Sequence, residues 1–351
     1  MSSYNRRDFL KTSLIGGVAL ASMNPLSAIA AEKKVLAGPA RVALTHGDNR
    51  ADMAFRSLSY FSKEIKQAIG NKLVVLKPNN VSINVPLAAT HADTLEGVLE
   101  FLWSINKMKN VVIAESAANG PTLDGFSNYG YHRLANKYQV RLVDLDQEKF
   151  DFVHVFDEKS FAPQKVRMSS MLLDSNSYIV SVARMKTHDR VIATLSLKNI
   201  VFGAPLKDLG FAWGSARKPG TVIDKPIVHG GGFRGINYNL YALSQRLHPH
   251  LALIDGFEGM EGNGPNNGTP VDHRICVAST DWFSADRVGI ELMGIDFAKV
   301  GYLNYCARTG AGPADLSQIE ILGEEVARHV KTYQLSKNIE NQLVWMNPVT
   351  A

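Results

Sequence analysis

The fold is decided by a stretch that reads LVVLKPNN from Leu73 to Asn80, where a short apolar run ends abruptly in polar residues. A second run of the same kind covers Asn110–Glu115, and the residues Asp93–Lys107 between the two runs have helical periodicity. An apolar strand, a helix and a second apolar strand are typical of a βαβ unit, in which the strands are parallel. The sequence therefore predicts an α/β fold with a mostly parallel sheet and crossover helices.

The same alternation continues on both sides of this unit, from residue 40 to the end of the chain. The predicted strands are Arg41–His46, Leu73–Pro78, Asn110–Glu115, Val140–Asp144, Tyr178–Ala183, Leu251–Asp255, Ile275–Ser279 and Ile319–Leu322. The predicted helices are Asp52–Ile69, Asp93–Lys107, Gly125–Lys137, Gly235–Gln245, Trp282–Met293 and Gly323–Lys331, and Val191–Phe202 is a further candidate. Residues 202–234 and 259–269 are rich in glycine without a clear period, so we expect two long loops there, and such loops are often functional.

The first thirty residues have the pattern of a removable export signal. Arg6 and Arg7 precede an uncharged apolar run, Thr12–Ile29, and small residues flank a cleavage point after Ala30. The segment resembles a twin-arginine signal, which implies that the chain folds first, engages the twin-arginine translocase and reaches the periplasm. The alternative is a membrane anchor, but the run is shorter than the roughly 20 residues that a spanning helix needs. Residues 31–351 would then form one large α/β domain or two interleaved lobes.

Composition excludes several function classes for the mature chain. The signal contributes a net +2 to the formal charge of +5, and the remaining charge of about +3 is too mild for nucleic-acid binding. No later stretch is apolar and long enough for a permanent membrane span. Cys276 and Cys306 are the only cysteines in the sequence, which excludes an iron–sulfur cluster held by four thiolates. They are either free and buried or joined in a disulfide.

Polar residues follow several of the predicted strands. They include Lys77 with Asn79, the segment Lys186-Thr187-His188-Asp189, and Asp255. Ligands of open parallel sheets bind outside the carboxyl ends of the strands, so we expect these side chains to converge on one crevice. Lysines suit an anionic ligand, whereas histidines and carboxylates suit a metal ion or proton transfer.

Lys198 is the least expected charge in the sequence, because the residues around it are apolar or small. If Val191–Phe202 is helical, Thr194 and Lys198 stand four residues apart on one face, with Asn199 beside them. A lysine is costly to bury without an anionic partner. That partner is either a phosphate or carboxylate ligand or a structural carboxylate of the protein, and the sequence leaves both open.

A divalent metal is a further cofactor that the polar residues could hold. His91, His188 and Asp189, together with Asp255 or Glu261, offer ligands suited to zinc, iron or manganese. None of these residues has a ligand spacing that a sequence can confirm. The alternative for His188 is a hydrogen bond to a carboxylate at the edge of the core.

The polar segments form an ordered series that resembles a known family. They are Lys77-Pro78-Asn79, Thr90-His91, Lys186-Thr187-His188 with Lys198-Asn199, Asp255-Gly256 with Glu261-Gly262-Asn263-Gly264-Pro265, and Ser284-Ala285-Asp286. On these motifs the chain resembles the domain-of-unknown-function family 362 through nearly all of the mature sequence. The resemblance implies a fold and a site but no reaction. Some relatives append a ferredoxin-like cysteine module, which this sequence lacks.

These observations give one leading hypothesis and two alternatives. The leading hypothesis is an exported enzyme of unknown reaction with one crevice. The predicted ligand-binding residues are Lys77, Asn79, Lys186, Thr187, Lys198 and Asn199. The predicted acids, bases or metal ligands are His188, Asp255 and Glu261. The first alternative is a periplasmic protein that binds an anion without chemistry, and the second is a structural partner of another exported enzyme.

Overall fold

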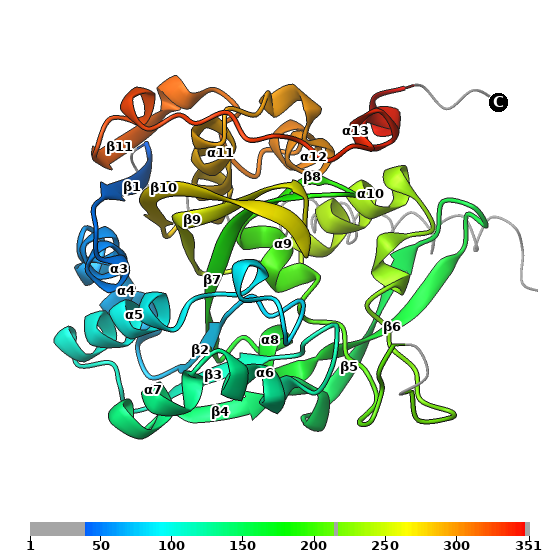
Figure 1. The fold of residues 1–351 in the computed structure, drawn as a ribbon, viewed down its shortest axis with the longest axis horizontal. Helices are drawn as coiled ribbons and strands as arrows, with labels where there is room; N and C mark the ends of the chain where they lie inside the picture. Colours follow the sequence, from blue (N-terminus) through cyan, green and yellow to red (C-terminus); the bar gives the residue numbers. More distant parts are fainter. Residues whose placement is uncertain (1–38, 214–216, 348–351) are drawn as a thin grey trace, which may run out of the picture. The chain divides into compact units, whose positions relative to one another are not determined.

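The computed structural model describes residues 39–213 and 217–347, and the predicted export signal lies outside them. A nine-stranded sheet runs through the described residues in the order β11-β1-β10-β9-β7-β2-β3-β4, with β8 paired to β7 (Figure 1). Its strands are β1 (Ala40–His46), β2 (Leu73–Lys77), β3 (Val111–Glu115), β4 (Arg141–Asp144), β7 (Ser177–His188), β8 (Ile192–Thr194), β9 (Leu251–Asn263), β10 (Asn267–Ser279) and β11 (Ile319–Gly323). The first and last strands are neighbours, so a single sheet spans the chain from residue 40 to residue 323.

The sheet is mostly parallel, as predicted. The pairs β2 with β3, β2 with β7, β3 with β4, β7 with β9 and β1 with β11 are all parallel. β10 is antiparallel to both β9 and β1, and β8 is antiparallel to β7. The antiparallel strands come from short connections, which can only reverse the chain, whereas parallel neighbours require a crossover.

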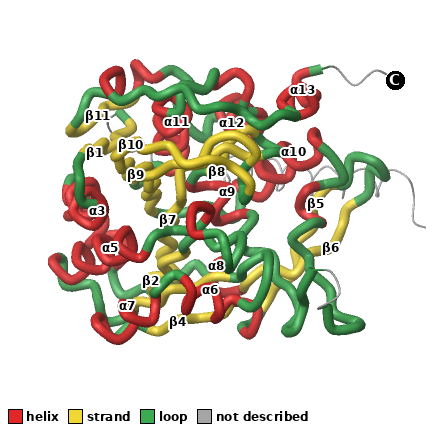
Figure 2. The backbone as a smooth tube through the Cα atoms, viewed as in Figure 1, coloured by secondary structure: helices red, strands yellow, loops and turns green. Residues whose placement is uncertain are grey.

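Helices cover both faces of the sheet (Figures 1 and 2). They are α3 (Arg50–Ser59), α4 (Ser62–Ile69), α5 (Ala92–Ser104), α6 (Thr122–Asn128), α7 (Tyr131–Tyr138), α8 (Ser170–Leu173), α9 (Ser196–Val201), α10 (Phe233–Ser244), α11 (Trp282–Leu292), α12 (Gly301–Arg308) and α13 (Ile339–Gln342). Side chains of β2 alternate between two cores: Val74 and Leu76 pack with α3, α4, α5 and α7, whereas Val75 packs with α9 to α12. This alternation explains why the strands read as continuous apolar runs.

Two predicted boundaries were too short. β7 continues through Lys186 and Thr187 to His188, and β9 continues to Asn263. The predicted loop at 259–269 is therefore wrong, because most of it belongs to the β9–β10 hairpin. Gly259, Gly264 and Gly268 serve close packing, since a Cβ at Gly259, for example, would collide with the hydroxyl of Tyr333, whereas Gly262 adopts a positive φ in open space.

Several helix predictions also need correction. The predicted helix Val191–Phe202 begins only at Ser196, because β8 takes Ile192–Thr194 into the sheet. Residues 52–69 and 125–137 each divide between two helices. The predicted helix at 323–331 is wrong beyond one 3-10 turn at Val326–Arg328. A hairpin of β5 (Phe150–Phe156) and β6 (Pro163–Ser169) was not anticipated.

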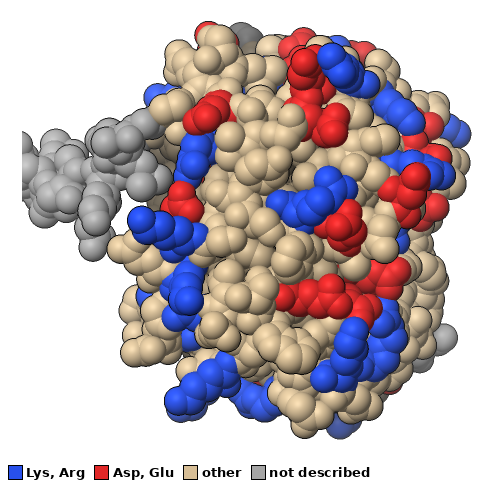
Figure 3. Space-filling model, turned by 90° about the vertical axis from the view of Figure 1, so that its left-hand side faces the viewer, with Lys and Arg blue, Asp and Glu red and all other residues tan. Residues whose placement is uncertain are grey.

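The predicted long connection after α9 is present, and it reaches α10 with one 3-10 turn at Ile227–His229 among its described residues. Charges of both signs are interspersed on the side of the molecule that carries α3 and α5, as Figure 3 shows. Within the described ranges, no helix has both the length and the apolar character needed to cross a bilayer. Cys276 and Cys306 are both free and buried.

Candidate functional site

A cavity of about 170 Å³ lies at the carboxyl ends of β2 and β3 and is closed by α9 and by the connection that follows it. The predicted residues that line it are Lys77, Asn79, His188, Lys198 and Asn199. Further lining residues are Asn80, Glu115, Ser116, Thr194, Phe202, Gly203, Trp213, Lys225, His229 and Pro265. The structure therefore brings together polar residues of β2, β7 and α9 that are far apart in the sequence.

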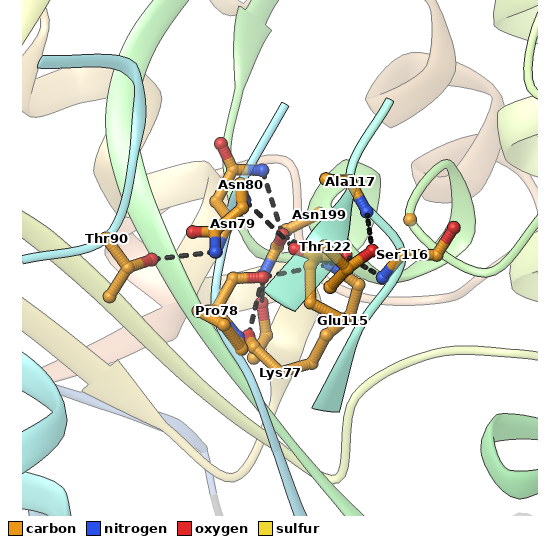
Figure 4. Close-up of polar contacts among 12 residues, drawn as sticks. Lys77, Pro78, Asn79, Asn80, Thr90, Glu115, Ser116, Ala117, Thr122 and Asn199 are labelled. Carbon is orange, nitrogen blue, oxygen red and sulfur yellow. Dashed lines mark hydrogen bonds and ion pairs between the residues drawn. The ribbon is translucent and has the colours of Figure 1, made fainter. Parts of the chain in front are cut away.

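A buried ion pair of Lys77 and Glu115 lines the cavity, and Figure 4 shows both side chains. The Lys77 ammonium lies 2.8 Å from the Glu115 carboxylate and also donates to Asn199 Oδ1 at 3.1 Å. Both side chains of the ion pair are almost fully buried. The backbone N–H groups of Asn80 and Ser116 donate to the same carboxylate at 2.9 and 2.8 Å. Because every charge has close partners, this pair is a structural anchor rather than a free ligand-binding group.

The asparagines beside the ion pair connect the end of β2 to α9 through hydrogen bonds. Asn79 Nδ2 donates to Asn199 Oδ1 at 2.9 Å, and the backbone N–H of Asn79 donates to Thr90 Oγ1 at 2.8 Å (Figure 4). Three buried side-chain atoms of residues that line the cavity have no hydrogen-bond partner among the described residues. They are Asn79 Oδ1, Asn80 Nδ2 and Thr194 Oγ1. Buried polar atoms of this kind are costly unless a ligand or water satisfies them.

Lys198 is the most unusual group in the cavity. Its side chain is only 7% exposed, yet its ammonium has no hydrogen-bond acceptor or ion-pair partner within the described part of the chain. Its ordered contact is with the ring of Phe202, whose centroid lies 5.1 Å from Nζ. The pKa of Lys198 is lowered to about 7, chiefly by burial; Asp189 opposes this shift, and Lys77 contributes to it to a smaller extent. A desolvated ammonium without a partner favours a negatively charged or carbonyl-bearing ligand.

Lys225 offers a contrast within the same cavity. Burial also lowers the pKa of Lys225 to about 7, but its ammonium donates to the carbonyl oxygens of Gly203 and Pro205 at 3.0 and 2.6 Å. Lys225 was missed in the sequence because it lies in a connection without periodicity. Its hydrogen bonds indicate that it holds that connection against α9.

Two histidines line the cavity near Lys198. His188 is buried, and its Nδ1 accepts a hydrogen bond from the N–H of Arg190 at 3.0 Å. Burial, with Lys198 as the next cause, holds the pKa of His188 well below its usual range, so the imidazole is neutral and carries its proton on Nε2. His229 stacks on Phe202 with ring centroids 5.5 Å apart, and burial lowers its pKa to about 3. Both rings are therefore neutral groups that can donate or accept a hydrogen bond.

Lys186 and Thr187 were predicted as ligand-binding residues, but they do not line the cavity. Lys186 is fully buried and donates to the carbonyl oxygen of Ala88 at 2.7 Å. Thr187 donates to the carbonyl oxygen of Gly262 at 2.9 Å. Both side chains hold neighbouring segments against the end of β7 by hydrogen bonds, outside the cavity.

Asp255 and Glu261 also lie outside the cavity. Asp255 accepts hydrogen bonds from Thr94 Oγ1 at 2.7 Å and lies within 3.6 Å of both Arg50 and Arg184. Glu261 accepts from the backbone N–H of Gln334 at 2.8 Å. The predicted acid or base roles of the two carboxylates therefore have no support in this geometry.

The predicted metal set is not assembled. His91 caps α5 by accepting from the N–H of Asp93, whereas His188 and Asp189 lie at the end of β7, with Nδ1 and Oδ1 3.3 Å apart. No group of three histidine, cysteine or carboxylate side chains in residues 39–213 and 217–347 is placed to hold a metal ion. The described residues thus give no support to the metal alternative.

Asp286 on α11 holds the first turn of α9 by hydrogen bonds. The Asp286 carboxylate accepts from the backbone N–H groups of Ser196 and Leu197 at 2.7 and 3.0 Å. These are among the first free N–H groups of α9, so the carboxylate caps the helix from outside. Asp286 thereby fixes the helix that presents Lys198 and Asn199, which gives the Ser284-Ala285-Asp286 segment a structural role.

Comparisons with known proteins give a family match and a distant relative. A family model described as "Domain of unknown function (DUF362)" matches residues 74–291, which contain the strands from β3 to β10, nearly all of β2, α9 and Asp286. The thylakoid-associated protein sll1697 of Synechocystis sp. is 23% identical over 242 residues, which is 68% of this chain and 68% of that protein.

Proposed function

The chain belongs to the DUF362 family of domains of unknown function, and from the geometry of its cavity we propose that it binds a small anionic molecule beside Lys198. The observation that carries this proposal is the Lys198 ammonium, which is buried, lines the cavity and has no acceptor among the described residues. Asn80 and Thr194 also line the cavity, and their Nδ2 and Oγ1 atoms, which have no partner in the described part of the chain, are donors of the kind that suits a carboxylate or phosphate oxygen.

The size of the cavity limits the ligand. A volume of about 170 Å³ is smaller than pockets for drug-sized ligands, which hold roughly 300–1,000 Å³. A carboxylic acid or inorganic phosphate of a few heavy atoms fits this volume. The buried ring of Phe202 provides an apolar wall beside the lysine, and apolar surroundings strengthen the attraction between an anion and an ammonium group.

The binding proposal can be tested with two simple anions, acetate and inorganic phosphate. Thermal unfolding at pH 6 should show a dose-dependent rise of the midpoint for the wild-type protein with at least one of them. Lys198→Met should abolish this rise, whereas Lys63→Met, on the exposed surface of α4, should leave it unchanged. An equal rise in Lys198→Met, or no rise with either anion in the wild-type protein, would refute the proposal.

We further propose that the protein is exported by the twin-arginine route to the periplasm and is cleaved near Ala30. The support is the sequence pattern of Arg6, Arg7 and the apolar run that follows. The related Synechocystis protein is named for its association with the thylakoid, and its name states no ligand or reaction. Replacing both arginines with lysine should retain the precursor in the cytoplasm, and amino-terminal sequencing of the wild-type protein should begin near Ala31. Periplasmic recovery of the double variant would contradict this route.

A further inference from the structure

We propose that Lys198 forms an imine with the carbonyl carbon of a small aldehyde or keto acid whose carboxylate is held in the same cavity. This inference rests on the proposed anion site and adds a covalent step to it. It follows from what distinguishes Lys198 from the other buried lysines near the cavity.

A lysine that attacks a carbonyl group needs a nitrogen that is free of hydrogen-bond acceptors. Lys77 is held by Glu115, Lys186 by the carbonyl oxygen of Ala88, and Lys225 by two carbonyl oxygens. Lys198 alone among these four has no such acceptor in the described residues, and its Nζ faces a cavity rather than packed protein. An exposed lysine has a free nitrogen too, but it lacks the apolar surroundings that favour the neutral, nucleophilic form.

The remaining atoms of the cavity suit the other end of such a ligand. Asn80 and Thr194 line the cavity with Lys198, and their buried atoms Nδ2 and Oγ1 have no partner among the described residues. An amide N–H and a hydroxyl are both donors from which a carboxylate can accept. The volume of about 170 Å³ corresponds to roughly five or six water molecules, so the acid must be short.

The covalent step balances without an oxidant or reductant. The neutral amine of Lys198 donates its electron pair to the carbonyl carbon, a C–N bond forms, and the carbonyl π electrons move to oxygen. A proton passes from nitrogen to that oxygen and gives a carbinolamine. The remaining proton on nitrogen then passes through solvent water to the hydroxyl, which leaves as water when the C–O bond breaks, and the C=N bond of the imine forms.

Two neutral histidines that line the cavity can hydrogen-bond to the reacting groups. His188 carries its proton on Nε2, because its Nδ1 is occupied by the N–H of Arg190, and it can donate a hydrogen bond to the oxygen that becomes water. His229 has no side-chain hydrogen bond among the described residues, and its pKa of about 3 makes it a weak base, so its neutral ring serves only as a hydrogen-bond partner for the reacting groups. The lowered pKa of Lys198 supports the same step, since about half of its amine is neutral at pH 7.

The test uses glyoxylate, the smallest keto-type acid, with sodium cyanoborohydride as an external hydride donor that reduces an imine to a stable secondary amine. The full-length mature protein is treated at pH 7, and the modified lysines are found by peptide mass spectrometry. We expect Lys198 to be labelled at least about tenfold faster than Lys225 or the exposed Lys63. Lys225 is the sharper control, because its pKa is also about 7 while its nitrogen is occupied by two carbonyl oxygens.

Acetate separates the covalent inference from the binding proposal. It offers a carboxylate without a reactive carbonyl, so it should protect Lys198 from labelling without forming an adduct. If acetate or phosphate binds but Lys198 is labelled no faster than Lys225, the imine is refuted and the anion site stands. If neither anion binds and Lys198 is not labelled preferentially, both proposals fail. The comparison is made within the wild-type chain, so no result depends on whether a variant folds.

Discussion

Replacing Lys198 with methionine should stabilise the protein, which is the opposite of what most substitutions of a buried residue do. The pKa of Lys198 is about 7 in the folded protein, against an ordinary value of 10.5. One pKa unit corresponds to about 1.4 kcal/mol, so at pH 7 the folded state loses on the order of 4 kcal/mol through this group, as an upper bound. Methionine has a similar shape and no charge to desolvate, and we expect a net gain of roughly 1–3 kcal/mol.

The sign of the pH dependence follows from the same shift. Between pH 7 and 10.5 the unfolded state binds more protons at this residue than the folded state, so the stability of the wild-type protein rises with pH there. The advantage of Lys198→Met should therefore be greatest at and below pH 7 and should shrink toward pH 10. The charged and titratable groups that face Lys198 are Lys77, Lys186, His188, Asp189 and His229.

Lys77→Met is the matched control, because it removes another buried lysine from the same cavity. It leaves the Glu115 carboxylate buried with two backbone N–H donors and no cation, which should cost about 3–5 kcal/mol. Urea denaturation of both variants at pH 7, in a buffer without carboxylate or phosphate, measures the two effects. A loss of stability in Lys198→Met as large as that in Lys77→Met would refute the conclusion that Lys198 lacks a partner.

Three further predictions concern the site and its support. Acetate affinity should fall about tenfold between pH 6 and pH 8 as Lys198 loses its proton, and thermal-shift titration checks this; an unchanged affinity would contradict it. Gly203→Ala should destabilise the protein by about 1–3 kcal/mol and abolish acetate binding, since the added Cβ would collide with Lys77 Nζ; wild-type binding and stability would contradict the close packing. Asp286→Ala should lower the free energy of unfolding by about 1–2 kcal/mol in urea denaturation and weaken acetate binding, because the N–H groups of Ser196 and Leu197 lose their acceptor. An unchanged free energy of unfolding and acetate affinity would contradict the capping role of Asp286.

The sequence predicts the sheet well because burial on both faces makes its strands apolar throughout. β2 and β3 begin and end within one residue of their predicted bounds. The length of the β9–β10 hairpin was not predictable, because Gly259 and Gly264 make close approaches to residues far away in the sequence, Tyr333 and Thr187. Local composition does not distinguish a glycine that packs from a glycine that turns.

The candidate site was predicted in part, for a reason that lies in the alternation of side chains. Lys77 follows Val75 at a spacing of two and lies on the α9 face of the sheet, where the cavity is. Asp255 follows Leu253 at the same spacing, but Leu253 packs on the face covered by α3 and α5. A position at the end of a strand is visible in the sequence, whereas the face it occupies depends on how the strands pair.

The most direct test of the account is the pKa of Lys198 itself, measured by carbon-13 NMR of lysine side chains labelled at Cε, with Lys198→Met assigning the resonance. The account predicts a pKa near 7 in the free protein, and a rise when acetate is added, because a bound anion favours the ammonium form. A pKa near the ordinary 10.5 that does not respond to acetate would contradict the claim that this lysine is a desolvated group awaiting an anionic ligand.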